Sequence, residues 1–329
     1  MNSLRFGILG TGRMAAAFAA EIQALTSFGV VAAAVGSRSL SNAEKFAAVH
    51  NIRHAHGSYE ALATNPEIDV IYVATPHSYH ETHTLLCLES GKHVLCEKPF
   101  ALNSAQASRM IAAAHRHGRF LMEAMWTRFL PAVNALREQL ARNVLGRIQL
   151  IIGGGAYIPT ADSDHYLLQA ALGGGALLDA GVYLVSFASS ILGSPKRVCA
   201  AGEIGTTSRV DEQDVWLAEY ANGAHAILYV SLRTRRAPDL EILGEQGRIL
   251  VHAPIFRPTQ LTLMRPSHAD EIQQYPCEGS GYRYQALEVL RCIREGHTQS
   301  SRMPLAETQA IMLTMDEIRA QIGLRYPGE

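Results

Sequence analysis

The sequence of 329 residues has few charged side chains and almost no imbalance between their signs. Asp, Glu, Lys and Arg make up 18% of it, and the formal net charge is −1. A chain without a strong field of one sign is not drawn to nucleic acid or to an anionic membrane surface. We therefore expect no nucleic-acid partner.

We also expect no membrane-length apolar run, no secretory leader and no paired cysteines. No apolar stretch approaches the ~20 residues of a membrane helix, so we expect no membrane partner. The start of the chain, MNSLRFGILG, lacks the basic region, apolar core and cleavage site of a leader. The five cysteines are odd in number and form no Cys-x-x-Cys pair, which favours reduced thiols and a cytoplasmic location.

What the sequence does contain is an alternation of strand-like and helical stretches in its first third. Apolar runs alternate with helical patterns, which predicts right-handed βαβ units and a parallel sheet. The expected strands are 4–9, 30–35, 68–75, 93–99 (strand, then turn) and 120–124. The expected helices are 14–25, 41–50, 79–90 and 103–117.

The pattern changes near Trp126, beyond which strand-like runs lie close together. Turn signals such as Ala221-Asn222-Gly223 and Gly244-Glu245-Gln246-Gly247 separate some of them, which predicts a largely antiparallel sheet. The expected strands are 147–157, 197–204, 214–221, 224–232, 238–243, 248–252, 260–264 and 271–275. The expected helices are 131–143, 175–192, 282–295 and 305–321.

These patterns predict an α/β protein of two domains. Residues 1–124 would form a dinucleotide-binding domain with a Rossmann, doubly wound parallel sheet. Residues 125–329 would form an α+β domain built on a largely antiparallel open sheet, and we expect it to bind the substrate.

A glycine motif of the form G-x-G-x-x-A, residues 10–15, follows the first expected strand and opens a helix. Gly10 permits a tight turn, and Gly12 lets the backbone approach a pyrophosphate. The N-terminus of the helix offers free N–H groups and a positive dipole end to the phosphates. A plain glycine-rich turn is the alternative. We predict a dinucleotide site at Gly10, Thr11, Gly12, Arg13 and Met14.

The end of the second expected strand indicates which dinucleotide is bound. NAD-binding folds place a carboxylate there to hold the ribose hydroxyls. In this sequence Ser37 and Arg38 follow the strand, and no carboxylate occurs before Glu44. Ser37 can donate a hydrogen bond to a 2′-phosphate, and Arg38 can pair with it. We therefore expect NADP, with NAD less favoured; the alternative is that Arg38 is a solvated loop residue.

Three further motifs complete a family pattern. They are Ala74-Thr75-Pro76-His77 with His80, then Cys96-Glu97-Lys98-Pro99, and Gly173-Gly174-Gly175-Ala176-Leu177-Leu178-Asp179-Ala180-Gly181-Val182-Tyr183. With the glycine motif they make the chain resemble the glucose–fructose oxidoreductase / inositol dehydrogenase (Gfo/Idh/MocA) family along essentially its full length.

Within that family the chain is most similar to the branch of dimeric dihydrodiol dehydrogenases and NADP-dependent D-xylose dehydrogenases. The similarity rests on residues 95–99, on 122–129 and on the spacing from Asp179 to Tyr183. The sequence departs from many members at two positions. His77 stands where many have Asn, and Tyr183 stands where many have His. Tyr at the second position is what the dihydrodiol dehydrogenase branch shows.

The resemblance implies a cofactor site and a catalytic site. Lys98 lies in a turn after a parallel strand, where α/β sheets bind ligands, and would bind the substrate oxygen. The resemblance makes Tyr183 the general acid/base, with Lys98 favouring its phenolate, and Asp179 the group that orients Lys98 or a substrate hydroxyl. From spacing alone, a surface carboxylate and a core aromatic would explain Asp179 and Tyr183. The expected cofactor contacts beyond the glycine motif are Ser37, Arg38, Thr75, Pro76, His77, His80, Glu97 and Lys98.

Aromatic residues and histidines leave two questions open. Trp126, Arg128, Phe129 and Tyr157 are candidates for the substrate pocket, and packing in the core explains them equally well. The histidines of residues 50–56 and 77–83 have spacings that zinc sites use, but no Cys or carboxylate set completes one. The resemblance implies a mechanism without a metal.

The function expected from the sequence is hydride transfer between NADP(H) and a small molecule: a sugar, a polyol or a vicinal diol. The types are aldose 1-dehydrogenase and trans-dihydrodiol dehydrogenase. One alternative is a carbonyl or anhydro-ketose reductase with the same site. Another is a catalytically silent NADP-sensing regulatory protein, which would have no use for a proton-transfer group. The resemblance also implies a homodimer that forms through the C-terminal sheet.

Overall fold

The computed structural model describes residues 3–159 and 165–329, which form two compact units. The first unit contains the chain up to Ala101, together with Ala105–Trp126 and Glu278–Gln309. The second contains Leu102–Ser104, Thr127–Cys277 and Ala310–Glu329. The division of roles between domains of residues 1–124 and 125–329 remains a prediction.

The first unit is built on a six-stranded sheet in which every pair of neighbours is parallel. The strand order β3-β2-β1-β4-β5-β6 is that of a doubly wound Rossmann fold, as the sequence predicted. Between β1 and β4 the order reverses, and ligands of such sheets bind at the carboxyl ends of the strands there. The strands are β1 (Leu4–Leu9), β2 (Val30–Gly36), β3 (His54–His56), β4 (Val70–Val73), β5 (His93–Glu97) and β6 (Leu121–Ala124).

Five helices connect these strands, and apolar side chains between helices and sheet form the core. β4 is buried at all four positions, as expected for a strand covered on both faces. Phe6, Phe18 and Tyr72 pack against one another, with the rings of Phe18 and Tyr72 stacked 3.9 Å apart. The helices are α1 (Arg13–Gln23), α2 (Leu40–Val49), α3 (Tyr59–Ala63), α4 (His80–Glu89) and α5 (Ser104–His117).

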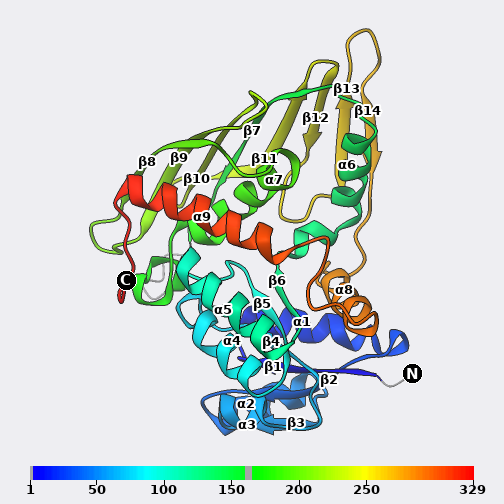
Figure 1. The fold of residues 1–329 in the computed structure, drawn as a ribbon, viewed down its shortest axis with the longest axis vertical. Helices are drawn as coiled ribbons and strands as arrows, with labels where there is room; N and C mark the ends of the chain where they lie inside the picture. Colours follow the sequence, from blue (N-terminus) through cyan, green and yellow to red (C-terminus); the bar gives the residue numbers. More distant parts are fainter. Residues whose placement is uncertain (1–2, 160–164) are drawn as a thin grey trace. The chain divides into compact units, whose positions relative to one another are not determined.

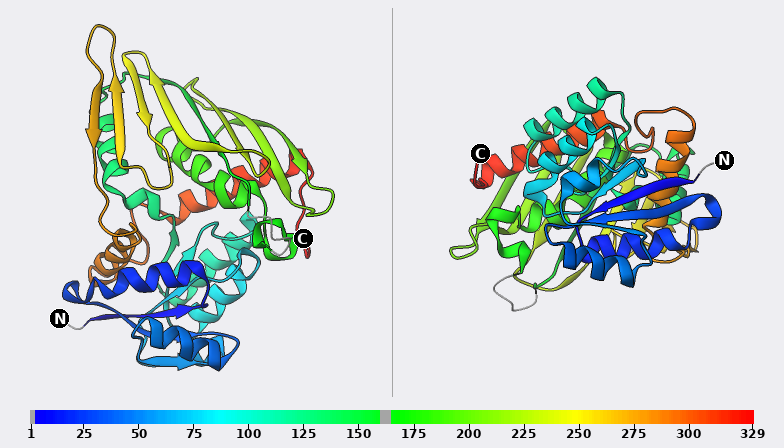
Figure 2. Two further views of the ribbon diagram at one scale, coloured as in Figure 1. Left: turned by 180° about the vertical axis from the view of Figure 1, so that it is seen from behind. Right: turned by 90° about the horizontal axis from the view of Figure 1, so that it is seen from below.

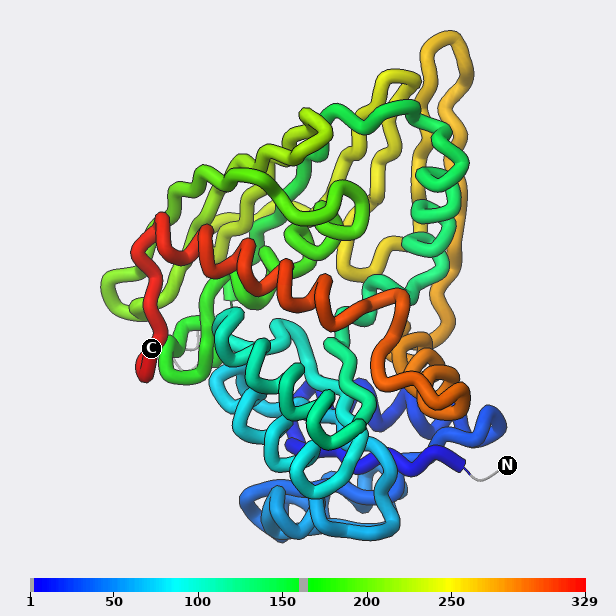
Figure 3. Tube along the Cα trace, viewed as in Figure 1, coloured from blue at the N-terminus to red at the C-terminus, as the bar shows by residue number. Residues whose placement is uncertain are grey.

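A late segment of the chain completes the first unit. Helix α8 (Arg283–Arg294) lies beside α1, and the trace in Figure 3 shows the orange segment returning to the blue one. The Leu121 N–H donates to the carbonyl of Thr298 at 3.1 Å, which ties this segment to β6. The Rossmann unit is therefore assembled from residues more than 150 positions apart in the sequence.

The second unit is built on an eight-stranded sheet with the order β14-β13-β12-β11-β7-β10-β9-β8. All neighbours are antiparallel except β7 and β10, so the prediction of a largely antiparallel sheet is confirmed. The expected hairpin at Gly244–Gly247 joins β11 to β12. The strands are β7 (Ile148–Ala156), β8 (Arg197–Ile204), β9 (Asp211–Glu219), β10 (His225–Ser231), β11 (Arg236–Gly244), β12 (Gly247–Val251), β13 (Gln260–Met264) and β14 (Glu271–Gln274).

Helices cover one face of this sheet. The opposed views of Figures 1 and 2 show α6 (Pro131–Ala141), α7 (Val182–Leu192) and the part of α9 (Leu305–Ile322) that belongs to this unit on the same face. Apolar side chains of the other face remain exposed, among them Ile152, Val215 and Ile227.

One expectation about apolar runs is wrong. The helical stretch Ala170–Leu192 is 23 residues long and has a window of mean hydropathy 1.6, which suffices by length and composition for a membrane span. The sequence analysis overlooked it because it assigned only residues 175–192 to a helix, which is shorter than the apolar stretch. Within the fold 67% of that window is buried, so packing in the core of the unit accounts for its composition.

Local features differ from the sequence prediction, among them an edge strand and a π-helical turn. The edge strand β3 was not expected, since its three residues become a strand only by pairing with Ala34, Val35 and Gly36 of β2. The expected helix 175–192 begins with a π-helical turn, Leu177–Gly181, before α7.

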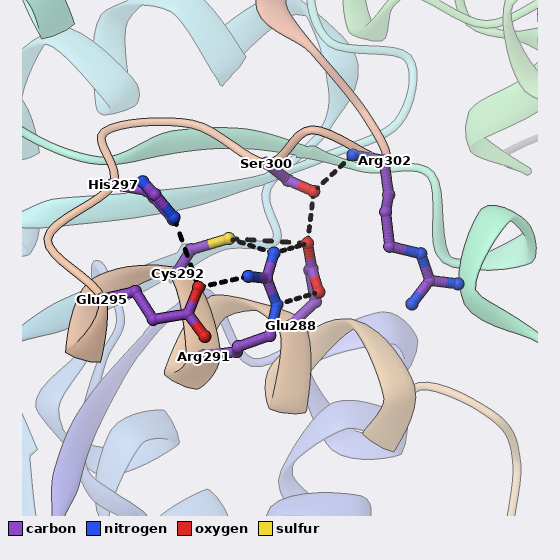
Figure 4. A network of polar contacts seen from close by, with 7 residues as sticks. All are labelled: Glu288, Arg291, Cys292, Glu295, His297, Ser300 and Arg302. Atoms are coloured by element: carbon purple, nitrogen blue, oxygen red, sulfur yellow. Dashed lines mark hydrogen bonds and ion pairs between the residues drawn. The ribbon is translucent and has the colours of Figure 1, made fainter.

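A polar network holds the late segment of the first unit together (Figure 4). The carboxylate of Glu288 accepts hydrogen bonds from Ser300 Oγ at 2.5 Å and from two nitrogens of Arg291, at 2.9 and 3.1 Å. Burial alone would raise the pKa of Glu288, but the hydrogen bonds from Arg291 and Ser300 lower it below its usual value. The network therefore connects α8 to the loop that pairs with β6.

Replacing Ser300→Ala removes a hydrogen bond to this buried carboxylate and should lower the free energy of unfolding by about 1–3 kcal/mol. Urea denaturation measures the loss. Because the pKa of Glu288 is depressed, the loss should be full above the usual pKa of Glu and should shrink as the pH falls through the folded value. Ser301→Ala, at the exposed neighbouring position, is the control and should change stability little. Equal losses in both variants would contradict the role given to the network.

Candidate functional site

The turn between β1 and α1 is shaped by two glycines with different constraints. Gly10 has a φ of 112°, and a Cβ there would lie 2.8 Å from the carbonyl oxygen of Ala74 at the end of β4. Gly12 precedes α1, and a Cβ there would meet nothing within 4 Å. No side chain of the described residues caps the N-terminus of α1. Free N–H groups facing open space at a helix N-terminus fit a dinucleotide pyrophosphate.

The remaining residues of the glycine motif lie on the surface of this turn. Gly12 and Arg13 are exposed, Thr11 and Met14 are half-buried, and the hydroxyl of Tyr282 lies 4.0 Å from Met14 Sδ. Ala15 is fully buried against the sheet, which is the close helix–strand packing that the motif needs.

An aromatic and basic cluster lies beyond the end of β2. Ser37 is buried, whereas Arg38 is exposed and hydrogen-bonds to the hydroxyl of Tyr59. Burial raises the pKa of Tyr59, and the nearby charge of Arg38 opposes that rise. The ring of His83 lies 4.6 Å from that of Tyr59, and burial lowers the pKa of His83 to about 4. His83 is therefore neutral near neutral pH, and Arg38 supplies the positive charge of the cluster.

His80 connects the loops that follow β4 and β5. Its side chain is fully buried, with Nδ1 at 2.8 Å from the carbonyl oxygen of Pro99 and Nε2 at 2.9 Å from that of Thr75. Burial lowers the pKa of His80, although both hydrogen bonds favour the protonated ring. Of the loop residues expected near a cofactor, Pro76 is exposed, and His77 is buried with its ring 5.7 Å from that of His80.

Glu97 and Lys98 lie at the carboxyl end of β5. The Glu97 carboxylate is buried, accepts a short hydrogen bond from the Tyr72 hydroxyl, and accepts one from the Lys98 backbone N–H at 3.2 Å. Lys98 is half-buried. Glu97 is thus engaged by its own turn, and the Lys98 ammonium is carried at the sheet edge where such folds bind ligands.

Asp179, in the second unit, is held by two tyrosine hydroxyls. Tyr157, just after β7, donates to Asp179 Oδ2 at 2.6 Å, and Tyr166 donates to Asp179 Oδ1 at 3.1 Å. Asp179 lies in the π-helical turn and Tyr183 in the first turn of α7. Both carboxylate oxygens of Asp179 therefore have a fixed donor in the segment that also carries Tyr183.

Tyr183 is nearly buried, with 8% of its surface exposed, and its ring centroid is 5.9 Å from that of Phe256.

Arg128 and Phe129 lie inside the second unit. The guanidinium of Arg128 donates to the hydroxyl and the carbonyl of Ser186 on α7, at 2.8 and 2.7 Å. Trp126 is buried in the first unit, 4.4 Å from the ring of Tyr282.

The glycine motif before Asp179 fits closely against neighbouring backbone and side chains. A Cβ on Gly174 would lie 2.4 Å from the carbonyl oxygen of Leu167, and one on Gly175 would lie 2.0 Å from Asp211 Oδ1. The φ values of Gly173 and Gly175 are 76° and 116°, which side chains rarely adopt. Three consecutive glycines are therefore needed for the chain to enter the π-helical turn at this point.

The sequence analysis missed four residues of these clusters: Tyr59, His83, Tyr166 and Asp211. Tyr166 and Asp211 lie outside the motifs and reach the helical segment only through tertiary contacts. Ser58, which caps the N-terminus of helix α3, was an available signal for the short helix that begins at Tyr59. Among the described residues, no three His, Cys, Asp or Glu side chains form a group that could hold a metal ion.

Comparisons with known proteins match both parts of the chain. Residues 4–125 match the Gfo/Idh/MocA oxidoreductase family with its NAD-binding Rossmann fold, and residues 133–250 match the Gfo/Idh/MocA C-terminal domain. The chain is 37% identical to trans-1,2-dihydrobenzene-1,2-diol dehydrogenase of Xenopus laevis, over 98% of this chain and 99% of that protein.

Two solved structures are similar over 98% of this chain. A 3-ketoreductase from Actinomadura kijaniata, in complex with NADP and TDP-benzene, shares 25% identity with a TM-score of 0.87 over 98% of that chain. A levoglucosan dehydrogenase in complex with NADH shares 21% identity with a TM-score of 0.89 over 97% of that chain, a likeness of fold. The two carry different nicotinamide cofactors, so they leave the choice between NADP and NAD open.

The two glycines of the turn give a matched pair of variants. Gly10→Ala forces a side chain into a positive φ and against Ala74, and should cost about 1–3 kcal/mol of stability in the free protein. Gly12→Ala meets no atom of the chain, so the free protein should keep its melting temperature while its affinity for NADP(H) and NAD(H) falls. Thermal unfolding and cofactor fluorescence titration measure the two effects. Unchanged cofactor affinity in Gly12→Ala would show that the pyrophosphate does not lie over this turn.

Proposed function

This chain belongs to the Gfo/Idh/MocA family of oxidoreductases, and from that premise we propose that it transfers a hydride between NADP(H) and a vicinal diol or a sugar. The match to a dihydrodiol dehydrogenase over nearly the whole chain supports a diol, and the levoglucosan dehydrogenase with the same fold is the reason to include a sugar. The observation that carries the proposal is the carboxylate of Asp179, held by two tyrosine hydroxyls in the segment that bears Tyr183.

In the proposed mechanism Tyr183 exchanges the proton of the reacting hydroxyl. Its near-complete burial shields the phenol from bulk water, which suits a proton-transfer group. Lys98 contacts the substrate oxygen through its ammonium and stabilises negative charge there. Asp179 accepts a hydrogen bond from a second substrate hydroxyl, because its two tyrosine partners keep the carboxylate in one orientation. The nicotinamide supplies or accepts the hydride when the cofactor is bound.

We propose NADP rather than NAD as the cofactor. A 2′-phosphate needs donors and positive charge where NAD-specific folds place a carboxylate. Ser37 offers a hydroxyl, and Arg38 offers a guanidinium that Tyr59 keeps close to the end of β2. Thr75, His77 and His80 would form the wall of the cofactor site through the loop after β4.

The open face of the second unit supports the proposal of a homodimer. Ile227 on β10 is paired in register with Ile152 on β7, and both side chains are exposed. Val215 on β9 and Ile272 on β14 add exposed apolar surface. Apolar side chains gathered on one face of a sheet favour burial against a second surface. A cytoplasmic location remains a prediction.

The proposed site serves both directions of the reaction. The same residues would serve a reductase of a ketose or another carbonyl compound, and the likeness to a 3-ketoreductase favours including that direction. The proton that Tyr183 accepts in oxidation is the one it donates in reduction, so the catalytic variants test both.

Tyr183→Phe and Lys98→Ala should each lower kcat by about 10²–10⁴-fold, the usual contribution of a proton-transfer group or its partner. Purified protein would be assayed with NADP or NAD and with D-xylose, D-glucose and trans-benzene dihydrodiol, by absorbance of the reduced nicotinamide. Tyr275→Phe, a half-buried tyrosine beside β14, is the control and should keep wild-type kcat. Tight NADP(H) binding without turnover in either direction would favour a cofactor-sensing protein instead.

Arg38→Ala should lower kcat/KM with NADP by about 10- to 100-fold, the value of a charge-assisted hydrogen bond, and should leave kcat/KM with NAD nearly unchanged. The measurement is the ratio of the two constants for one substrate. Arg53→Ala, another exposed arginine of the same unit, is the control and should keep the wild-type ratio. A parallel fall with both cofactors would contradict the assignment of the 2′-phosphate to Arg38.

A further inference from the structure

Two aspartates of β9 lie buried directly beneath the segment that carries Asp179 and Tyr183. Asp211 and Asp214 each have 0% of their surface exposed. Asp211 Oδ2 accepts a hydrogen bond of 2.6 Å from the backbone N–H of Leu177, the first residue of the π-helical turn. Asp211 therefore supports that turn from below, two residues before Asp179.

Two glycines next to the pair have no room for a side chain of their own. A Cβ on Gly175 would lie 2.0 Å from Asp211 Oδ1, and a Cβ on Gly202 of β8 would lie 2.2 Å from Asp214 Oδ1. Gly202 is paired in register with Asp214. A side chain at either glycine would collide with one of the two carboxyl groups, so glycine at both positions leaves room for the pair.

The two carboxyl groups are each other's polar partner. Neither oxygen of Asp214, nor Oδ1 of Asp211, receives a hydrogen bond from an N–H or O–H of the described residues. Two carboxylates cannot hydrogen-bond to each other, so the contact between these side chains requires a proton on one of them. Burial raises the pKa of Asp214 to about 10, and the negative charge of Asp211 adds to the rise. Burial raises the pKa of Asp211 too, but the Leu177 N–H favours its charged form, whereas no N–H of the described residues reaches Asp214; Asp214 is therefore the group that holds the proton.

Other titratable and charged groups approach the pair from the C-terminal part of the second unit. The Tyr326 hydroxyl donates to the carbonyl of Gly174 at 2.5 Å, and the guanidinium of Arg319 lies 4.8 Å from the Tyr326 ring centroid. Burial raises the pKa of Tyr326, and the charge of Asp211 raises it further. Tyr326 is therefore a neutral donor, and the guanidinium of Arg319 lies over its ring.

We propose that Asp211 and Asp214 share one proton and act as a positioning pair: protonated Asp214 donates to Asp211, whose carboxylate holds the turn that carries Asp179 toward Tyr183. Neither aspartate contacts a reacting atom. The part of this inference that concerns turnover rests on the proposed function, whereas the shared proton does not.

The first test is the melting temperature of wild type and Asp214→Asn as a function of pH. Asn keeps a donor for Asp211 but has no proton to lose. Because the folded pKa of Asp214 lies above the unfolded value, wild type should lose stability progressively as the pH rises between the two values. From about pH 5 to about pH 9 wild type should therefore fall more steeply than Asp214→Asn. Parallel curves would overturn the shared proton. Asp270→Asn, at an exposed position, is the control and should parallel wild type.

The second test separates positioning from simple packing. Asp214→Leu removes the donor and should lower kcat by about 10- to 100-fold, as small displacements of catalytic groups do, while cofactor affinity changes little. Asp214→Asn, which keeps the donor, should have a kcat close to that of wild type. A fall of kcat in Asp214→Asn equal to that in Asp214→Leu would overturn the positioning role. If wild type shows no turnover, the proposed function fails, while the melting curves still decide whether the proton is shared. If Asp214→Leu does not fold, the kcat of Asp214→Asn alone tests the positioning role, and a fall in that kcat overturns it.

Discussion

The hydrogen bond between the Leu177 N–H and the Asp211 carboxylate is the contact on which the position of the π-helical turn, and with it of Asp179, depends. It fixes where the π-helical turn begins, and so where Asp179 meets Tyr157 and Tyr166. It also explains the glycines of the motif, because a side chain at Gly175 would displace the same carboxylate. A charged group is expensive to bury, and this one is tolerated because backbone N–H groups and a neighbouring acid surround it.

The features predicted from the sequence are those that local pattern determines. The strand before Gly10, the helix after it and the left-handed Gly91 at the end of α4 depend on residues a few positions apart. β3 was missed because its three residues carry no strand pattern without their partner β2. Tyr166 and Asp211 were missed for the same kind of reason, since Asp211 is 34 residues from Leu177 and no spacing rule connects them.

Burial decides how three other parts of the sequence are read. The stretch Ala170–Leu192 is apolar because most of it fills the core of the second unit. Conversely, Arg128 and Glu288 are charged residues that the folded chain buries, Arg128 with a partner 58 residues away and Glu288 with partners on its own helix and in the loop that follows it. Hydropathy alone would have placed all three wrongly, because it records composition and not which neighbours the fold supplies.

The first unit recruits α8 and the loop after it from beyond residue 278, and this has a consequence for how the protein is made. The ribosome synthesises the six strands of the Rossmann sheet early. Helix α1 can pack against α8, and β6 can bond to Thr298, only after most of the chain has been translated. The nascent unit thus carries an uncovered apolar surface throughout synthesis of the second sheet. A fragment cut after Trp126 would keep that surface permanently, so excising the Rossmann unit requires grafting the later segment back onto it.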